Sequence, residues 1–295
     1  MVAPRRAMAR RADGGIVTSM RRDAANAPIE VRTLRGDLSV LLGSGGNIAV
    51  LHGSDGKFLV DAGITASKPQ LVDALDKISG DPIRYLINTH WHFDHTDGNE
   101  WVHGAGATII AHENTRKHLA ETTRVNAWDF TFAPAPAGAL PATTVRGPAT
   151  LYINNATVAI DPFEPAHTDG DVRVTFAESD VVHVGDTWWN GHYPFIDYST
   201  GGSIDGTIRA TAANIGHVTD RTVVIPGHGP VGDKSQLVEY HDMLRTVRDA
   251  VAALKKQGRS IEETIAAKPT GAYDKKWGTF LIAPDTFTRL VYAGV

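Results

Sequence analysis

Hydrophobic and polar positions change period several times along the chain, and each change predicts a different element. Apolar runs bounded by turn residues indicate strands, whereas apolar residues three or four positions apart indicate helices. In the N-terminal half these patterns predict strands over residues 29–42, 48–52, 58–61, 83–88 and 107–111, and helices over 68–79 and 113–121. In the C-terminal half they predict strands over 150–153, 157–160, 172–176, 181–184 and 222–225, and helices over 204–215, 235–256, 261–267 and 284–292.

Both halves of the chain combine hairpins with strand–helix–strand units. Residues 50–63 and 174–187 are weakly similar, because each has a strand, a turn at Ser-Asp, a second strand and an Asp just past its end. Two sheets that pack face to face under helices need this alternation. We therefore expect an α/β fold, an αββα sandwich of two mixed sheets flanked by helices, as a single domain over residues 28–295.

Two segments have no regular period. Residues 122–148 contain Trp128, Phe130, Phe132 and four prolines, and a loop this long in a compact domain is usually functional or disordered. We expect it to form a flap that brings apolar side chains to a substrate. The alternative is that its aromatic residues only complete the core. Residues 1–27 are predicted to be a disordered extension.

The arginines are concentrated at the N-terminus. Residues 1–35 hold eight arginines and three acidic residues, a net +5, which leaves −9 for the rest of a chain whose formal charge is −4. A signal peptide needs an apolar stretch of roughly 7–15 residues after its charges, and none follows here. We therefore expect a cytoplasmic protein, with a periplasmic location left open.

Composition narrows the partners and the chemistry. Hydrophobic residues make up 42% of the chain and charged residues 21%, which is typical of soluble globular proteins. No apolar run approaches the roughly 20 residues that span a bilayer, and the acidic body disfavours nucleic acid. We expect a small-molecule substrate, no nucleic acid and no membrane, and a homodimer is left open. The chain has no cysteine and 13 histidines, so histidine must supply any soft metal ligand.

The strongest chemical signal directly follows the predicted strand 83–88. Three imidazoles and one carboxylate lie there within six residues: His90, His92, Asp94 and His95. Residues two apart in an extended segment face the same way, so the first two histidines can bind one metal together. The last two residues fit the turn into a helix and can point to a second metal. Imidazole and carboxylate are ligands that suit zinc.

Three further candidates lie next to later predicted strands. His167 precedes the strand 172–176, Asp186 follows 181–184, and His228 follows 222–225 within a Gly-His-Gly turn. Any one of them alone would more often be structural. Their shared placement at strand ends predicts that they converge.

These motifs, in this order, resemble the metallo-β-lactamase superfamily over about residues 30–235, with the Asp186-containing ligand set of glyoxalase II and the lactonases. The resemblance implies seven metal ligands: His90, His92, Asp94, His95, His167, Asp186 and His228. One metal would take His90, His92 and His167, and the other Asp94, His95 and His228, with Asp186 bridging both. The resemblance also implies that Asp61 supports the ligand loop by hydrogen bonding.

The implied cofactor is a pair of Zn²⁺ ions, with iron or manganese as alternatives. Two metals about 3.5–4 Å apart can share a hydroxide and hold the attacked oxygen. This predicts a hydrolase that opens an ester, lactone, thioester or amide bond, with Asp94 and Asp186 taking part in catalysis. One alternative is a β-lactam hydrolase of the all-histidine zinc class, which generally lacks the bridging Asp. Another is a mononuclear iron oxygenase of the persulfide type, which uses fewer ligands.

The segment after Asp186 is rich in aromatic residues. Trp188, Trp189, His192 and Tyr193 follow the candidate ligand directly, so some of them should face the pocket. We predict that Tyr193 donates a hydrogen bond to an oxyanion and that His192 does the same or transfers a proton. Ordinary aromatic packing under a loop is the competing interpretation.

Overall fold

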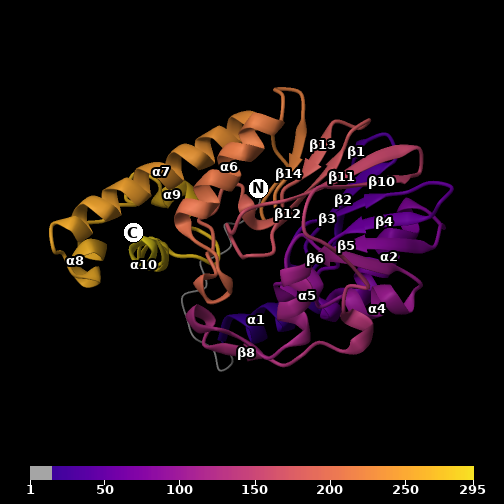
Figure 1. The fold of residues 1–295 in the computed structure, drawn as a ribbon, viewed down its shortest axis with the longest axis horizontal. Coiled ribbons are helices and arrows are strands. Elements are labelled where there is room, and N and C mark those ends of the chain that lie inside the picture. The colour runs from indigo at the N-terminus through magenta and orange to yellow at the C-terminus, as the bar shows by residue number, and fades with distance from the viewer. Residues whose placement is uncertain (1–14) are drawn as a thin grey trace.

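The computed structural model describes residues 15–295 and contains two β-sheets that lie face to face between helices (Figure 1). The larger sheet has the strand order β1 (Glu30–Arg35), β2 (Leu38–Leu42), β3 (Ile48–Leu51), β4 (Lys57–Val60), β5 (Ile83–Ile87), β6 (Thr108–His112) and β9 (Thr143–Val145). The smaller has the order β10 (Ala149–Ile153), β11 (Ala156–Pro162), β12 (Val172–Phe176), β13 (Val181–His183) and β14 (Val223–Ile225).

Each sheet is mixed, because it starts as antiparallel hairpins and ends in parallel strands. In the larger sheet β1 to β4 pair antiparallel and β4, β5, β6 and β9 pair parallel. In the smaller sheet β10 to β13 are antiparallel and β14 joins β13 in parallel. This arrangement confirms the predicted αββα sandwich.

The core between the sheets follows from residue alternation along the strands. Successive strand residues face opposite sides of a sheet, so Val40 packs into the sandwich while its neighbour Leu41 packs outward under the helices. At the centre, Phe58 meets Phe176 of the other sheet edge to face, with ring centroids 6.1 Å apart. The two sheets are therefore held together by apolar packing.

Helices cover the outer faces of both sheets. The larger sheet is covered by α2 (Lys68–Ile78) and α4 (Asn99–Gly104), with α5 (Glu113–Ala120) after β6, and the smaller by α6 (Ile204–His217), α7 (Lys234–Lys256) and α10 (Pro284–Gly294). Two short helices, α8 (Ile261–Ala266) and α9 (Asp274–Trp277), connect the last two of these. The start of α7 is fixed by a capping box, in which the Asp233 side chain accepts from the Gln236 backbone. None of the described helices is both long and apolar enough to cross a membrane.

The structure differs from the prediction of a disordered extension over residues 1–27. Gly15–Ala24 form the helix α1, while residues 1–14 lie outside the described part of the chain. Val17 and Ala24 are 1% and 4% exposed and pack with Ile64 and Phe93. Two buried side chains seven positions apart lie on one face of a helix. The arginine content of the segment obscured this stripe.

Residues 122–148 also contain more regular structure than predicted. Thr123–Val125 (β7) and Phe130–Phe132 (β8) form a small antiparallel pair, separated by a short 3-10 helix at Asn126–Trp128. Further on, β9 joins the edge of the larger sheet. Strands of three residues are too short to show a period, so the sequence pattern did not indicate them.

We expect Phe58→Ala to lower the free energy of unfolding by about 3–5 kcal/mol, because it leaves a cavity between the sheets. Tyr152→Ala, at an 83% exposed aromatic on the edge strand β10, is the control and should change it by less than about 0.5 kcal/mol. Denaturant titration measures both. Equal effects of the two variants would contradict the packing described here.

Candidate metal centre

Strands of both sheets deliver the candidate ligands to one place. The segment after β5 carries His90 and His92 and then turns into the short helix α3 (Phe93–Thr96), which carries Asp94 and His95. From the smaller sheet come the residue that precedes β12 and the residues that follow β13 and β14: His167, Asp186 and His228. The backbone N–H of Asn47 donates to Gly227 O at 2.8 Å, which ties the end of β14 to the larger sheet.

The seven residues fall into two buried clusters. In each cluster one nitrogen or oxygen of every residue lies within 4.8 Å of the others: His90, His92, His167 and Asp186 in the first, and Asp94, His95 and His228 in the second. In the first, His92 Nδ1 is 2.9 Å from His167 Nε2. In the second, His228 Nε2 is 3.2 Å from Asp94 Oδ2. The donor atoms of each cluster therefore converge on a common centre.

Asp186 lies between the two clusters. Its Oδ2 is 3.3 Å from His167 Nε2 in the first and 3.4 Å from His228 Nε2 in the second. Its Oδ1 is 3.1 Å from His95 Nε2, but no hydrogen bond to Oδ1 forms there. One carboxylate thus faces both groups of imidazoles.

Three of the histidines form a hydrogen bond through one ring nitrogen with a group outside their cluster. His95 Nδ1 is 2.7 Å from Asp61 Oδ2, His92 Nε2 is 3.1 Å from Asp197 Oδ2, and His167 Nδ1 is 2.9 Å from Phe195 O. Such partners fix the tautomer and the orientation of a ligand imidazole. With one ring nitrogen engaged by the protein, the other is the nitrogen that can offer its lone pair to a metal.

Of the two carboxylates that hydrogen-bond the histidines, Asp61 was predicted from the sequence and Asp197 was not. Asp61 also accepts from Thr89 N at 2.7 Å and Thr89 Oγ1 at 2.8 Å, and so braces the start of the ligand loop, the role implied by the family resemblance. Its backbone has φ 67°, a conformation that Asp tolerates better than most residues. Asp197 was not singled out, because its partner His92 is 105 residues away and no local motif links them.

Charges within the site compensate one another. Burial favours a neutral Asp186, but the imidazoles of His228 and His95 above all hold its pKa well below the ordinary value. Burial also opposes protonation of His228, yet the Asp186 and Asp94 carboxylates raise its pKa to about 9. Burial lowers the pKa of His90 well below the usual value, so this ring is neutral. The site therefore presents ionised carboxylate and imidazole nitrogen side by side.

Two buried polar atoms at the centre have no hydrogen-bond partner among residues 15–295: His90 Nε2 and Asp186 Oδ1. An unsatisfied buried polar group costs about 1–3 kcal/mol, so both atoms call for a partner that the protein does not supply. Imidazole nitrogen and carboxylate oxygen are donors that zinc takes. The donor sets of both clusters fit metal ions.

Two glycines allow the ligands to sit this closely. A Cβ at Gly46 would lie 2.2 Å from the His95 ring, and one at Gly227 would lie 1.9 Å from Asp186 Oδ1. Neither position has room for a side chain behind the ligand. The Gly-rich turn after β2 and the Pro-Gly-His turn after β14 are therefore part of the site.

The structure does not bring Tyr193 to the clusters, and its predicted role as an oxyanion donor is wrong. Its ring stacks on Phe287 in the core, with centroids 4.5 Å apart. Its hydroxyl donates to Asp274 Oδ1 at 2.9 Å and lies 3.2 Å from Thr270 O. The hydroxyl is therefore already engaged away from the ligands.

His192 lies closer to the site than Tyr193 does. Its ring packs on Phe280, with centroids 4.5 Å apart, and its Nδ1 is buried without a partner. Burial, and then the neighbouring His228, lower its pKa to about 4, so the ring is neutral at pH 7. The predicted role of His192 remains a hypothesis, restricted to a neutral imidazole.

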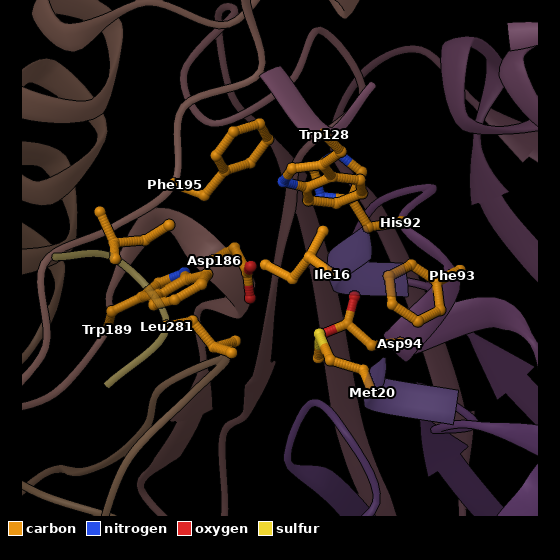
Figure 2. Close-up of a pocket in the computed structure, with 11 residues that line it drawn as sticks. Ile16, Met20, His92, Phe93, Asp94, Trp128, Asp186, Trp189, Phe195 and Leu281 are labelled. Atoms are coloured by element: carbon orange, nitrogen blue, oxygen red, sulfur yellow. The ribbon is translucent and has the colours of Figure 1, made fainter. Parts of the chain in front are cut away.

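A pocket opens beside the clusters (Figure 2). Its lining residues come from α1, the ligand loop and the segments after β7, β13 and α9: Ile16, Met20, His92, Phe93, Asp94, Trp128, Asp186, Trp189, Phe195, Leu281 and Ile282. Trp189 reaches the pocket wall next to His228, with ring centroids 4.3 Å apart, and its indole N–H is buried without a partner. Trp128 stacks on Phe195 and lies tilted against His92, so one aromatic of the predicted flap lines the pocket.

Phe130 and Phe132 differ from Trp128 because they do not line the pocket. All three pack against the cluster that includes Val17, Ile64 and Phe93. The predicted flap is therefore divided, because Trp128 is at the site and its two neighbours in β8 support it.

Comparison with known proteins agrees with this geometry. A family model described as metallo-beta-lactamase superfamily matches residues 41–233. A hydroxyacylglutathione hydrolase from Polaromonas sp. (strain JS666 / ATCC BAA-500) is 25% identical over 222 residues, which are 74% of this chain and 75% of that protein.

Two solved structures show the same fold. DIM-1 metallo-beta-lactamase superposes with a TM-score of 0.61 at 20% identity, covering 75% of this chain and 99% of that one. A stereoselective inverting sec-alkylsulfatase from Pseudomonas sp. superposes with a TM-score of 0.65 at 17% identity, and covers 92% of this chain but only 51% of its own.

We expect Asp186→Ala to lower the metal content of both clusters, because its carboxylate faces both. His167→Ala should lower only the first, leaving about one ion per chain where the unaltered protein takes about two. Elemental analysis after zinc loading and gel filtration measures both variants. Full metal content in Asp186→Ala would show that its carboxylate is not shared.

Proposed function

The chain belongs to the metallo-β-lactamase superfamily, and from that membership we propose a binuclear zinc hydrolase that opens an ester, lactone or thioester bond of a small molecule. The observation that carries this proposal is the position of Asp186 between two sets of imidazoles. A site of this form suits two metals that share one carboxylate. Metal dependence and hydrolysis follow from the family, whereas zinc, the count of two and the bond type are our inference.

Two bound zinc ions would supply Lewis acidity and lower the pKa of water to about 7, so hydroxide is available at neutral pH. The protein provides the carboxylates that orient the histidines and the apolar walls of the pocket. Asp61 and Asp197 hold His95 and His92 in place. The apolar pocket walls exclude bulk water, which strengthens every electrostatic interaction inside.

Trp189 is the residue we assign to the hydrogen-bond role predicted for Tyr193. Within the described residues its indole N–H has no hydrogen-bond partner, as is also true of Trp128 in the same pocket wall, but Trp189 is the one that lies beside His228. A preorganised donor aimed at developing oxygen charge lowers the barrier of acyl transfer. His192 stays a hypothesis for a second hydrogen-bonding group, because its ring is neutral and its buried Nδ1 has no partner within the described residues.

The substrate bond is proposed from the ligand set and from the relative. The matched relative is named as a hydroxyacylglutathione hydrolase, which favours thioesters and, by the same chemistry, esters and lactones. A β-lactam hydrolase of the all-histidine zinc class generally lacks the carboxylate supplied here by Asp186. A mononuclear iron oxygenase binds a single metal, so the second cluster, which contains His228, would hold no ion.

The zinc-loaded protein should hydrolyse members of a panel of aryl esters, lactones and thioesters faster than it hydrolyses β-lactams. Rates should fall to background after chelation and return with zinc. The panel is run beside Asp186→Ala as the matched inactive variant. Metal-independent turnover, or turnover of β-lactams alone, would contradict the proposal.

Trp189→Phe should reduce kcat by roughly 10-fold or more with little change in KM, because it removes one donor to the developing charge and keeps an aromatic wall. Trp188→Phe is the control. Its indole is fully buried and also has an unpartnered N–H, but it does not line the pocket. It should leave kcat within about twofold. Equal losses in both variants would mean that the indoles act only through packing.

A further inference from the structure

Helix α1 forms one wall of the pocket. Ile16 and Met20 are four positions apart, so they lie on one face of the helix, and both line the pocket. Figure 2 shows the Ile16 side chain reaching between Asp186 and Phe93, with Met20 next to Asp94. The segment nearest the N-terminus of the described chain therefore contacts the metal end of the pocket directly.

The helix is attached to the ligand loop itself. The Arg21 guanidinium donates two hydrogen bonds to Asp97, each 2.7 Å long, and lies 5.3 Å over the Phe93 ring. Asp97 directly follows α3, the helix that carries Asp94 and His95. A bidentate arginine–carboxylate pair fixes both distance and orientation. The position of α1 is thus set relative to the metal ligands.

The side chains of α1 that line the pocket are less buried than those that anchor the helix. Val17 and Ala24 are buried against the body of the protein and anchor the helix. Ile16 and Met20 pack against the same cluster but are only half-buried, and both line the pocket. Two apolar side chains held open toward a reaction site are available to contact a substrate.

Apart from the indole N–H groups of Trp128 and Trp189, the walls of the pocket are polar only where the candidate ligands lie. Of the lining residues, three are candidate ligands, His92, Asp94 and Asp186, and the others are apolar or aromatic. Such walls bind the apolar part of a ligand, while the few polar groups fix its orientation. A substrate that fits has its scissile carbonyl at the ligands and an uncharged hydrocarbon group against α1.

We propose that α1 selects the substrate of this enzyme, with Ile16 setting the length of the apolar acyl chain that the pocket accepts. This proposal rests on the proposed hydrolysis of esters and lactones. Because the Ile16 side chain lines the pocket together with the candidate ligands Asp94 and Asp186, it limits how far an acyl chain bound at those ligands can extend. The natural substrate class is then an ester or lactone with a short, uncharged acyl group.

The test compares Ile16→Ala with Ile16→Phe on aryl esters that share one leaving group and carry acetyl, butyryl or hexanoyl chains. Ile16→Ala should raise the ratio of kcat/KM for hexanoyl over acetyl ester by about 10-fold, since a few methylene groups discriminate by that amount or more. Ile16→Phe should lower the same ratio. Opposite shifts from one position separate a change in pocket size from a loss of stability.

Binding provides a readout that does not depend on turnover. Calorimetric titration of the zinc-loaded protein with acetate, butyrate and hexanoate, the products of those esters, should show Ile16→Ala gaining most for hexanoate. Thr18→Ala, on an exposed position of α1, is the control and should leave the series unchanged.

A second pair of variants tests the attachment of the helix. Arg21→Ala removes the pair with Asp97 and should weaken chain-length selection, bringing the hexanoyl-to-acetyl ratio toward that of Ile16→Ala. Arg22 is exposed and, among residues 15–295, forms an ion pair with its neighbour Asp23 alone, so Arg22→Ala should not change the ratio.

The outcomes distinguish this inference from the proposed function. If the unaltered, zinc-loaded protein hydrolyses no ester of any length, the proposed function fails. If it hydrolyses esters but both Ile16 variants keep the chain-length ratio and the carboxylate affinities of the unaltered protein, the helix is only a structural cover and the inference is overturned.

Discussion

A buried carboxylate among imidazoles is the interaction on which the site depends. Asp186 is 3% exposed and ionised, and the neighbours that hold its pKa down most are the imidazoles of His228 and His95. Burying such a charge is costly unless it is compensated. Histidines of both clusters supply part of that compensation, and a metal in each cluster would supply the rest. Because the same carboxylate faces both clusters, the two half-sites form one centre.

The way the two sheets pack brings those histidines to the carboxylate. The larger sheet contributes the ligand loop after β5, and the smaller contributes Asp186 and His228 after β13 and β14. Gly46 and Gly227 allow the two contributions to touch, since a side chain at either would collide with a ligand. The apolar contact between the sheets, centred on Phe58 and Phe176, therefore positions the reaction site as well as the fold.

Residues that follow strands could be placed from sequence, whereas the direction of a side chain in a loop could not. Four of the candidate ligands follow apolar runs that predict strands: His90, His92, Asp186 and His228. Ligand sites in such folds lie at the carboxyl ends of strands. Tyr193 was predicted from nearness in the chain alone, and nearness does not say which way a ring points.

Contacts between segments that are far apart in the chain could not be predicted from the sequence either. Asp197 meets His92 across 105 positions, and α1 is held by Asp97 across 76 positions from Arg21, so neither contact leaves a local pattern. For α1 the arginine content outweighed an apolar stripe of few residues. The candidate metal ligands could therefore be identified from the sequence, whereas the helix that forms one wall of the pocket is found only in the structure.

Anomalous diffraction from crystals of the zinc-loaded protein, recorded on both sides of the zinc absorption edge, tests the central claim most directly. The account predicts two zinc peaks about 3.5–4 Å apart, one in each cluster, with an oxygen of Asp186 in contact with each. A single peak, or two peaks of which only one touches Asp186, would contradict it.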